Sequence, residues 1–141
     1  MEESTGKVLG VGGVFLRCAN RDATVAWYRD VLGMEPNDYC GFDFMHADSA
    51  AKFPVGARTI FGPFAHDTDY FKPSELPYML NLIVDDLSAI LARAETAGAA
   101  QVQPREDTEY GDFGWLIDPD GRKIELWEPK EPPSDSGEAS L

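Results

Sequence analysis

The chain has 141 residues, of which 12 are Lys or Arg and 25 are Asp or Glu, so its formal net charge at pH 7 is -13. This length suits one domain with its own core and is too short for two ordinary domains. The acidic balance argues against a nucleic-acid partner, because phosphate contacts need clustered basic residues. The most apolar early stretch, residues 8–16, is short and carries three glycines, unlike a signal peptide or a membrane span. We expect a cytoplasmic protein that binds neither nucleic acid nor membranes.

Both ends of the chain have the composition of tails. Residues 1–7 are polar, and residues 129–141 are rich in proline and charge. A single domain is therefore predicted over residues 8–128, followed by a disordered acidic tail. The two cysteines, Cys18 and Cys40, lack the spacing of a metal or redox motif, so we expect reduced thiols rather than a disulfide.

The first half of the chain predicts one strand, one helix and two weaker strands. Residues 9–18 have the alternation of a strand. Asn20 can cap a helix whose apolar residues recur at helical spacing until Gly33 ends it. Residues 39–45 and 58–61 are weaker strand candidates, and residues 47–55 between them favour a polar connection. Residues 64–77 have no regular period and predict an irregular segment that could form a lid.

The second half gives clearer signals. Residues 78–84 alternate like a strand, and Asp86 can cap a helix that Gly98 ends. A short strand is expected at residues 102–105. Residues 112–128 then read DFGWLIDPDGRKIELWE, two alternating arms joined by an Asp-Pro-Asp-Gly turn, which predicts an antiparallel hairpin.

The two halves repeat one order of elements. In each half a strand leads into a capped helix that ends at glycine, and further short strands follow. The sequence therefore predicts an α+β fold built from two tandem βαβββ modules, the first over about residues 8–64 and the second over about residues 77–128.

Three segments carry a resemblance to a known family. They are TVAWYRDVLGME at residues 24–35, LNLIVDDLSAILARAETAG at residues 80–98 and FGWLIDPDGRKIELWEP at residues 113–129. With these motifs the chain resembles the vicinal oxygen chelate superfamily, the glyoxalase, bleomycin-resistance and extradiol-dioxygenase group. The resemblance implies a cupped mixed sheet whose two modules line one cavity, and it implies a homodimer.

Metal-dependent members of that superfamily take one ligand, usually His or Glu, from each of four strand positions. Carried onto this chain, the resemblance places these positions at Gly13, near residues 59–61, at Met79 and at Glu125. Glycine cannot ligate, a thioether suits hard divalent ions poorly, and residues 59–61 include no acid or histidine. Only Glu125 matches, so no metal or other cofactor is expected.

Strand alternation predicts which side chains share the cup with Glu125. It sends Phe15, Arg17, Asn81, Lys123 and Trp127 the same way. We expect Arg17 or Lys123 to neutralise Glu125, because an unpaired buried carboxylate is costly. Such an ion pair would either anchor a ligand or only fill the former metal site.

Two aromatic residues complete the candidate ligand-binding set. Trp115 could stack on a planar ligand, although a tryptophan in a strand is more often part of the core. Tyr70 lies in the irregular segment between the modules.

Three functions remain open from the sequence. The first is a glyoxalase-like protein that binds a small organic molecule in the cup, with Glu125 as an acid-base residue if turnover occurs. The second is a divalent-metal-dependent lyase, isomerase or dioxygenase that uses Glu125 with His46 or His66. The third is a binding or regulatory subunit that acts through its outer surface.

Overall fold

The computed structural model describes residues 6–39 and 41–131. Residues 1–5, Cys40 and residues 132–141 lie outside the described residues, and with them much of both predicted tails. The elements, in chain order, are α1 (Arg21–Leu32), α2 (His46–Lys52), β1 (Leu80–Ile83), α3 (Leu87–Thr96), β2 (Glu106–Thr108), β3 (Gly111–Ile117) and β4 (Lys123–Pro129). None of the helices in this part of the chain has the length and hydropathy needed to cross a membrane. The predicted α+β class is confirmed.

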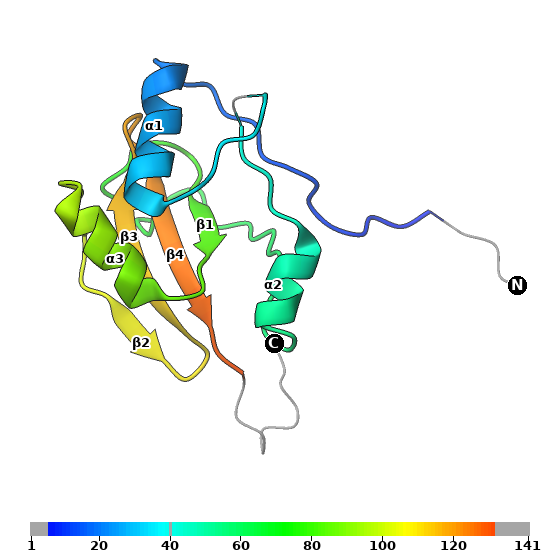
Figure 1. Ribbon diagram of the computed structural model, residues 1–141. Helices are drawn as coiled ribbons and strands as arrows, with labels where there is room; N and C mark the ends of the chain where they lie inside the picture. The colour runs from blue at the N-terminus through cyan, green and yellow to red at the C-terminus, as the bar shows by residue number, and fades with distance from the viewer. Residues whose placement is uncertain (1–5, 40, 132–141) are drawn as a thin grey trace, which may run out of the picture.

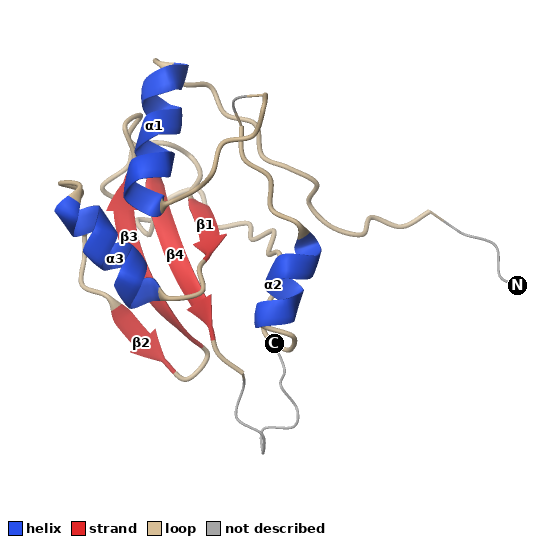
Figure 2. Ribbon diagram, in the orientation of Figure 1, coloured by secondary structure: helices blue, strands red, loops and turns tan. Residues whose placement is uncertain are grey.

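The strands form one mixed sheet in the order β1-β4-β3-β2 (Figure 2). β3 and β4 are antiparallel arms of the predicted hairpin, and β1 runs parallel to β4. At the turn Gly121 has a φ of 86°, a left-handed value that favours glycine. The Asp118 carboxylate accepts hydrogen bonds from the backbone N–H groups of Asp120 and Arg122, which fixes the turn.

The two main helices begin and end where their capping residues predict. The side chain of Asn20 accepts a hydrogen bond from the Ala23 N–H at 3.0 Å, and that of Asp86 accepts one from the Ala89 N–H at 3.0 Å. α1 ends at Gly33, which has a φ of 74°. The Arg93 guanidinium of α3 donates to the last carbonyl of α1, so one helix closes the end of the other.

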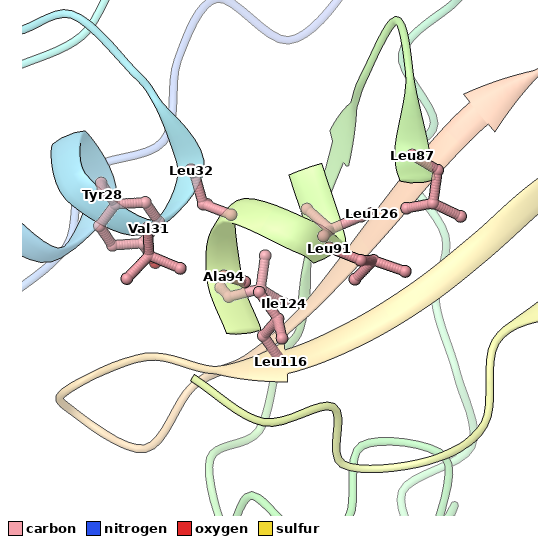
Figure 3. Close-up of a cluster of buried hydrophobic side chains, with 9 residues drawn as sticks. All are labelled: Tyr28, Val31, Leu32, Leu87, Leu91, Ala94, Leu116, Ile124 and Leu126. Atoms are coloured by element: carbon pink, nitrogen blue, oxygen red, sulfur yellow. The ribbon is translucent and has the colours of Figure 1, made fainter. Parts of the chain in front are cut away.

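The core lies between α1, α3 and one face of the sheet (Figure 1). Figure 3 shows its side chains, which come from α1, α3, β3 and β4: Tyr28, Val31, Leu32, Leu87, Leu91, Ala94, Leu116, Ile124 and Leu126. Gly114 of β3 leaves room for α3, because an added Cβ would lie 3.3 Å from both methyl groups of Leu91. The alternate residues of β3 and β4 consequently face the other side of the sheet.

A buried ion pair anchors the turn of the hairpin to α1. The Arg122 guanidinium lies 2.7 Å from Asp118, which also accepts a hydrogen bond from the Tyr28 hydroxyl at 2.7 Å. Asp120 accepts from the Ala19 N–H and the Thr24 hydroxyl, both at 3.0 Å. These bonds fix how the β3–β4 hairpin sits against the helical layer, and with it the face that the helices leave free.

The strands expected in the first half are not found. Residues 9–18, 58–61 and the described part of residues 39–45 contain no strand, so the sheet includes only residues from 80 onward (Figure 2). Alternation specifies which side a residue would face, but a strand forms only when its backbone groups find a partner strand. The first of these segments leads away from the sheet (Figure 1), and most of its apolar residues are exposed, Leu16 and Cys18 being half-buried.

Two further expectations need correction. Residues 47–55, expected as a connection, contribute most of α2. Its sequence HADSAAK has three alanines, which favour helix, but Met45 caps it without a side-chain hydrogen bond, so no start signal marked it. The short strand predicted at residues 102–105 lies instead at β2 (Glu106–Thr108). The second βαβββ module is therefore present, while the tandem arrangement stays a prediction.

Candidate ligand-binding site

The sheet face opposite the helices carries the predicted site. Trp115 of β3 pairs directly with Glu125 of β4, which pairs on its other side with Asn81 of β1. Lys123 and Trp127 lie two residues before and after Glu125 on the same strand, so they share its face. Five predicted site residues are thus brought together by the register of three neighbouring strands.

Glu125 is the centre of a hydrogen-bond network with uncharged donors. Its Oε2 accepts from the Trp115 indole N–H at 2.9 Å and from the Tyr70 hydroxyl at 2.5 Å. Its Oε1 accepts from the Asn81 side-chain amide at 2.7 Å. The residue is only 8% exposed. A buried carboxylate is stabilised by donors aimed at it from three separate parts of the chain.

Lys123 is buried beside this network. Its ammonium donates to the backbone carbonyl of Tyr70 at 2.7 Å and lies 5.0 Å from the Tyr70 ring and 5.8 Å from the Trp115 ring. Burial lowers the pKa of Lys123, and the nearby negative charges of Glu125 and Asp69 oppose that effect. The expected neutralising ion pair does not form: within the described residues neither Lys123 nor Arg17 lies within ion-pair distance of Glu125, because the three neutral donors take that place.

Tyr70 joins the site from the irregular segment at residues 64–77. Its ring stacks on that of Phe64, with centroids 5.7 Å apart and planes 17° apart. Burial, together with the hydrogen bond to Glu125, raises the pKa of the Tyr70 hydroxyl. The phenol therefore keeps its proton and stays a donor to the carboxylate. The lack of a period predicted an irregular segment correctly, but no sequence signal specified this contact.

A row of parallel aromatic rings continues along the same face. Phe113 stacks between Trp115 and Trp127, with centroid distances of 6.2 and 6.5 Å and interplanar angles of 17° and 4°. The Trp127 indole N–H is buried with no hydrogen-bond partner among the described residues. The face therefore combines a flat apolar wall with one carboxylate and one ammonium, a combination that suits a planar molecule with a polar substituent.

Phe15 and Arg17 lie elsewhere. Both contribute to a groove beside β1 that Met79, Tyr78 and Arg122 also line. Phe15 is 96% exposed, and the backbone carbonyl of Arg17 accepts a hydrogen bond from Arg122. In the part of the chain that the structure describes, neither residue contacts Glu125. Their predicted role in ligand binding stays a prediction.

The residues at this site do not fit a divalent metal. Both oxygens of Glu125 already accept hydrogen bonds from nitrogen or hydroxyl donors. Residues 6–39 and 41–131 hold no group of three or more His, Cys, Asp or Glu side chains that could bind a metal ion. His46 and His66 are both exposed, the former at the start of α2 and the latter in the segment that carries Tyr70.

Comparison with protein families decides what kind of domain this is. The model of the glyoxalase-like domain matches residues 13–127. The chain belongs to this glyoxalase-like family. Its resemblance to the vicinal oxygen chelate superfamily is thereby confirmed. A search of the curated proteins found no match.

Several solved structures are similar to this glyoxalase-like chain. One is the integron cassette protein VPC_CASS1 from the mobile metagenome of V. Pseudocholerae, 19% identical over 86% of this chain and 98% of that chain, with a TM-score of 0.51. Another is TnmS3, an antibiotic binding protein from Streptomyces sp. CB03234, 21% identical over 79% and 88%, with a TM-score of 0.47. A member of the glyoxalase/bleomycin resistance protein/dioxygenase superfamily from Sphaerobacter thermophilus is 22% identical over 79% and 90%, with a TM-score of 0.45. The first of these supports the fold alone.

Proposed function

We propose that this glyoxalase-like protein binds a small organic molecule on the Glu125 face of its sheet and needs no metal to do so. The observation that carries the proposal is the buried Glu125 carboxylate, which holds three neutral donors from β1, β3 and the 64–77 segment. Burying a charge this way costs free energy that an apolar side chain would avoid. Such a group is typical of a binding site, where a few convergent polar atoms lie in an aromatic wall.

The first experiment identifies whether ligands reach this face. A library of small aromatic and polar fragments is titrated into ¹⁵N-labelled protein, and the indole N–H signals of the three tryptophans are followed. We expect binders to shift Trp115, which donates to Glu125, and to leave Trp27 unchanged, because Trp27 packs with the core on the helical side. Fragments that bind only outside this face, or none at all, would contradict the proposal.

A matched variant tests the role of the carboxylate. Glu125→Gln keeps the size of the side chain and removes its charge, so a ligand that donates to the carboxylate should bind about tenfold more weakly. Unchanged affinity would show that Glu125 does not anchor the ligand. Metal analysis of protein prepared without chelator tests the alternative: stoichiometric zinc, nickel, iron or manganese would favour a metal-dependent lyase, isomerase or dioxygenase.

We also propose that two copies of the chain associate. Support comes from the apolar segment around Val8, Leu9, Val14 and Phe15, which is exposed, and from β1, which among residues 6–39 and 41–131 pairs only with β4 and leaves its other edge open. An open strand edge beside exposed apolar residues favours association with another chain. Light scattering after size exclusion measures the mass, and a monomer at micromolar concentration would refute this part.

A further inference from the structure

The Tyr70 side chain stands where a ligand of the Glu125 face would bind. Its hydroxyl donates to Glu125, its ring is stacked on Phe64, and its ring also lies below the Lys123 ammonium at 5.0 Å. Each contact is one that a separate small molecule could make in the same way. The other two donors to Glu125, Asn81 and Trp115, belong to the sheet itself and would remain.

The contacts of Tyr70 are fewer than those of a core residue. The side chain is 37% exposed and belongs to an irregular segment, whereas Trp115 and Lys123 below it are 1% and 2% exposed. The Tyr70 hydroxyl reaches the buried Glu125, and its backbone carbonyl accepts from the buried Lys123. Moving this residue therefore breaks its hydrogen bonds with Glu125 and Lys123, the ring stack on Phe64 and the ring contact with the Lys123 ammonium, while the sheet and its packed helical side stay intact.

We propose that Tyr70 is a built-in occupant of the site, and that the ligand is a planar aromatic molecule with a phenolic hydroxyl which displaces it. This deepens the proposed function and rests on it. The hydroxyl would donate to Glu125 Oε2 in place of Tyr70, and the ring would lie beside Trp115 below the Lys123 ammonium. An ammonium has three donors, so Lys123 could also bind an acceptor next to that hydroxyl once the Tyr70 carbonyl moves away.

The site should favour a ligand that carries a hydroxyl proton as well as an aromatic ring. The bond that Tyr70 makes is from a neutral hydroxyl to a carboxylate, and burial together with this bond raises the pKa of that hydroxyl, so the site favours the neutral form. An ether of the same shape lacks the proton and would place an oxygen lone pair against the carboxylate. Phenol and methyl ether are thus a matched pair of probes.

If a ligand must displace the Tyr70 side chain, removing that side chain should raise the affinity for the ligand. Binding to the wild type must first disrupt the Tyr70 contacts, so only the fraction of molecules with Tyr70 displaced can bind. The experiment compares 2-naphthol with 2-methoxynaphthalene on the wild type, Tyr70→Ala and Tyr70→Phe, using ligand fluorescence and the Trp115 indole signal. Tyr39→Ala is the control, because Tyr39 is an exposed tyrosine outside the site.

We expect Tyr70→Ala to bind 2-naphthol at least tenfold more tightly than the wild type, and Tyr70→Phe to be intermediate because it keeps the ring without the hydroxyl. The ether should bind at least tenfold more weakly than 2-naphthol, and Tyr39→Ala should match the wild type. Equal affinity of wild type and Tyr70→Ala would overturn the proposal, as would equal affinity for phenol and ether. If Tyr70→Ala does not fold, Tyr70→Phe takes its place in the test. An intact Trp115 indole signal shows that the site of this variant is folded, and its affinity for 2-naphthol should then exceed that of the wild type.

The outcomes separate this inference from the proposed function. If fragments shift Trp115 in the wild type but Tyr70→Ala brings no gain, the face binds ligands and Tyr70 is only part of its wall. If no probe or fragment shifts Trp115 in any variant, the proposed function itself fails.

Discussion

Replacing Glu125 tests whether its carboxylate is enclosed by the network. In Glu125→Ala three donors lose their acceptor, but they differ in access to water: Asn81 is exposed, Tyr70 is partly exposed, and the Trp115 indole is buried. An unsatisfied buried donor costs about 1–3 kcal/mol, whereas an exposed donor turns to water. We therefore expect Glu125→Ala to lower the free energy of unfolding by about 2 kcal/mol, nearly all of it from Trp115.

Glu125→Gln should cost much less, because the network can adapt to an amide. The Gln carbonyl can occupy the position of Oε2 and accept from Trp115 and Tyr70. The Gln amide then faces Asn81, which can rotate by half a turn and accept with its own carbonyl. The charge-assisted part of the bonds is lost, but so is the desolvation of a carboxylate, and the net change should stay below about 1 kcal/mol.

Urea unfolding followed by far-UV circular dichroism measures both variants. A double-mutant cycle with Trp115→Phe isolates the indole, since Glu125→Ala should cost less once the indole N–H is gone. If Glu125→Ala is as stable as the wild type, the carboxylate lies in bulk water and is not enclosed by the network. An equal loss in the free energy of unfolding for Glu125→Gln and Glu125→Ala would contradict the claim that the network adapts to an amide.

Three further predictions concern the turn, Tyr70 and association. Asp118→Asn removes the closer and fully buried of the two carboxylates beside Arg122, leaving Asp120 at 3.4 Å, and should cost about 3 kcal/mol, while Asp30→Asn, which breaks an exposed pair at a similar distance, should leave the urea midpoint nearly unchanged. Because the pKa of Tyr70 is raised in the folded state, its stabilising contribution is complete below pH of about 10, where an ordinary tyrosine ionises, and is lost as the pH rises through the folded value. Absorbance at 295 nm should therefore show no tyrosinate difference between wild type and Tyr70→Phe at a pH of about 10; a difference there would contradict the hydrogen bond to Glu125. Leu9→Asp, which charges an exposed apolar residue, should shift a dimer to monomer in light scattering, and an unchanged mass would remove this segment from the interface.

The two main helices and the β3–β4 hairpin were predictable because their signals are local. Asn20, Gly33 and Asp86 set helix ends through their own side chains or backbone conformation, and the Asp-Pro-Asp-Gly turn fixes the hairpin and hence which residues share a face with Glu125. Strand formation at residues 9–18 was not predictable in the same way, because it depends on a partner that local alternation does not specify.

The site shows the same division between local and distant signals. Alternation placed Asn81, Lys123 and Trp127 on the face of Glu125 correctly, since all lie on paired strands. The bond from Tyr70 joins residues 55 positions apart and comes from a segment without a period, so no spacing rule could find it. The roles of Asp118 and Arg122 were also missed. Their signal was the turn itself, in which the first Asp lies four residues before an Arg.

The measurement that bears most directly on the function is the affinity of the strongest Trp115-shifting fragment with and without chelator. Isothermal titration of the wild type is carried out in excess EDTA, without additions, and with zinc, nickel, iron(II) or manganese each at one equivalent. Metal-independent binding predicts the same dissociation constant in all cases, and weaker binding to Glu125→Gln. Binding that disappears in EDTA and returns with one metal would contradict it.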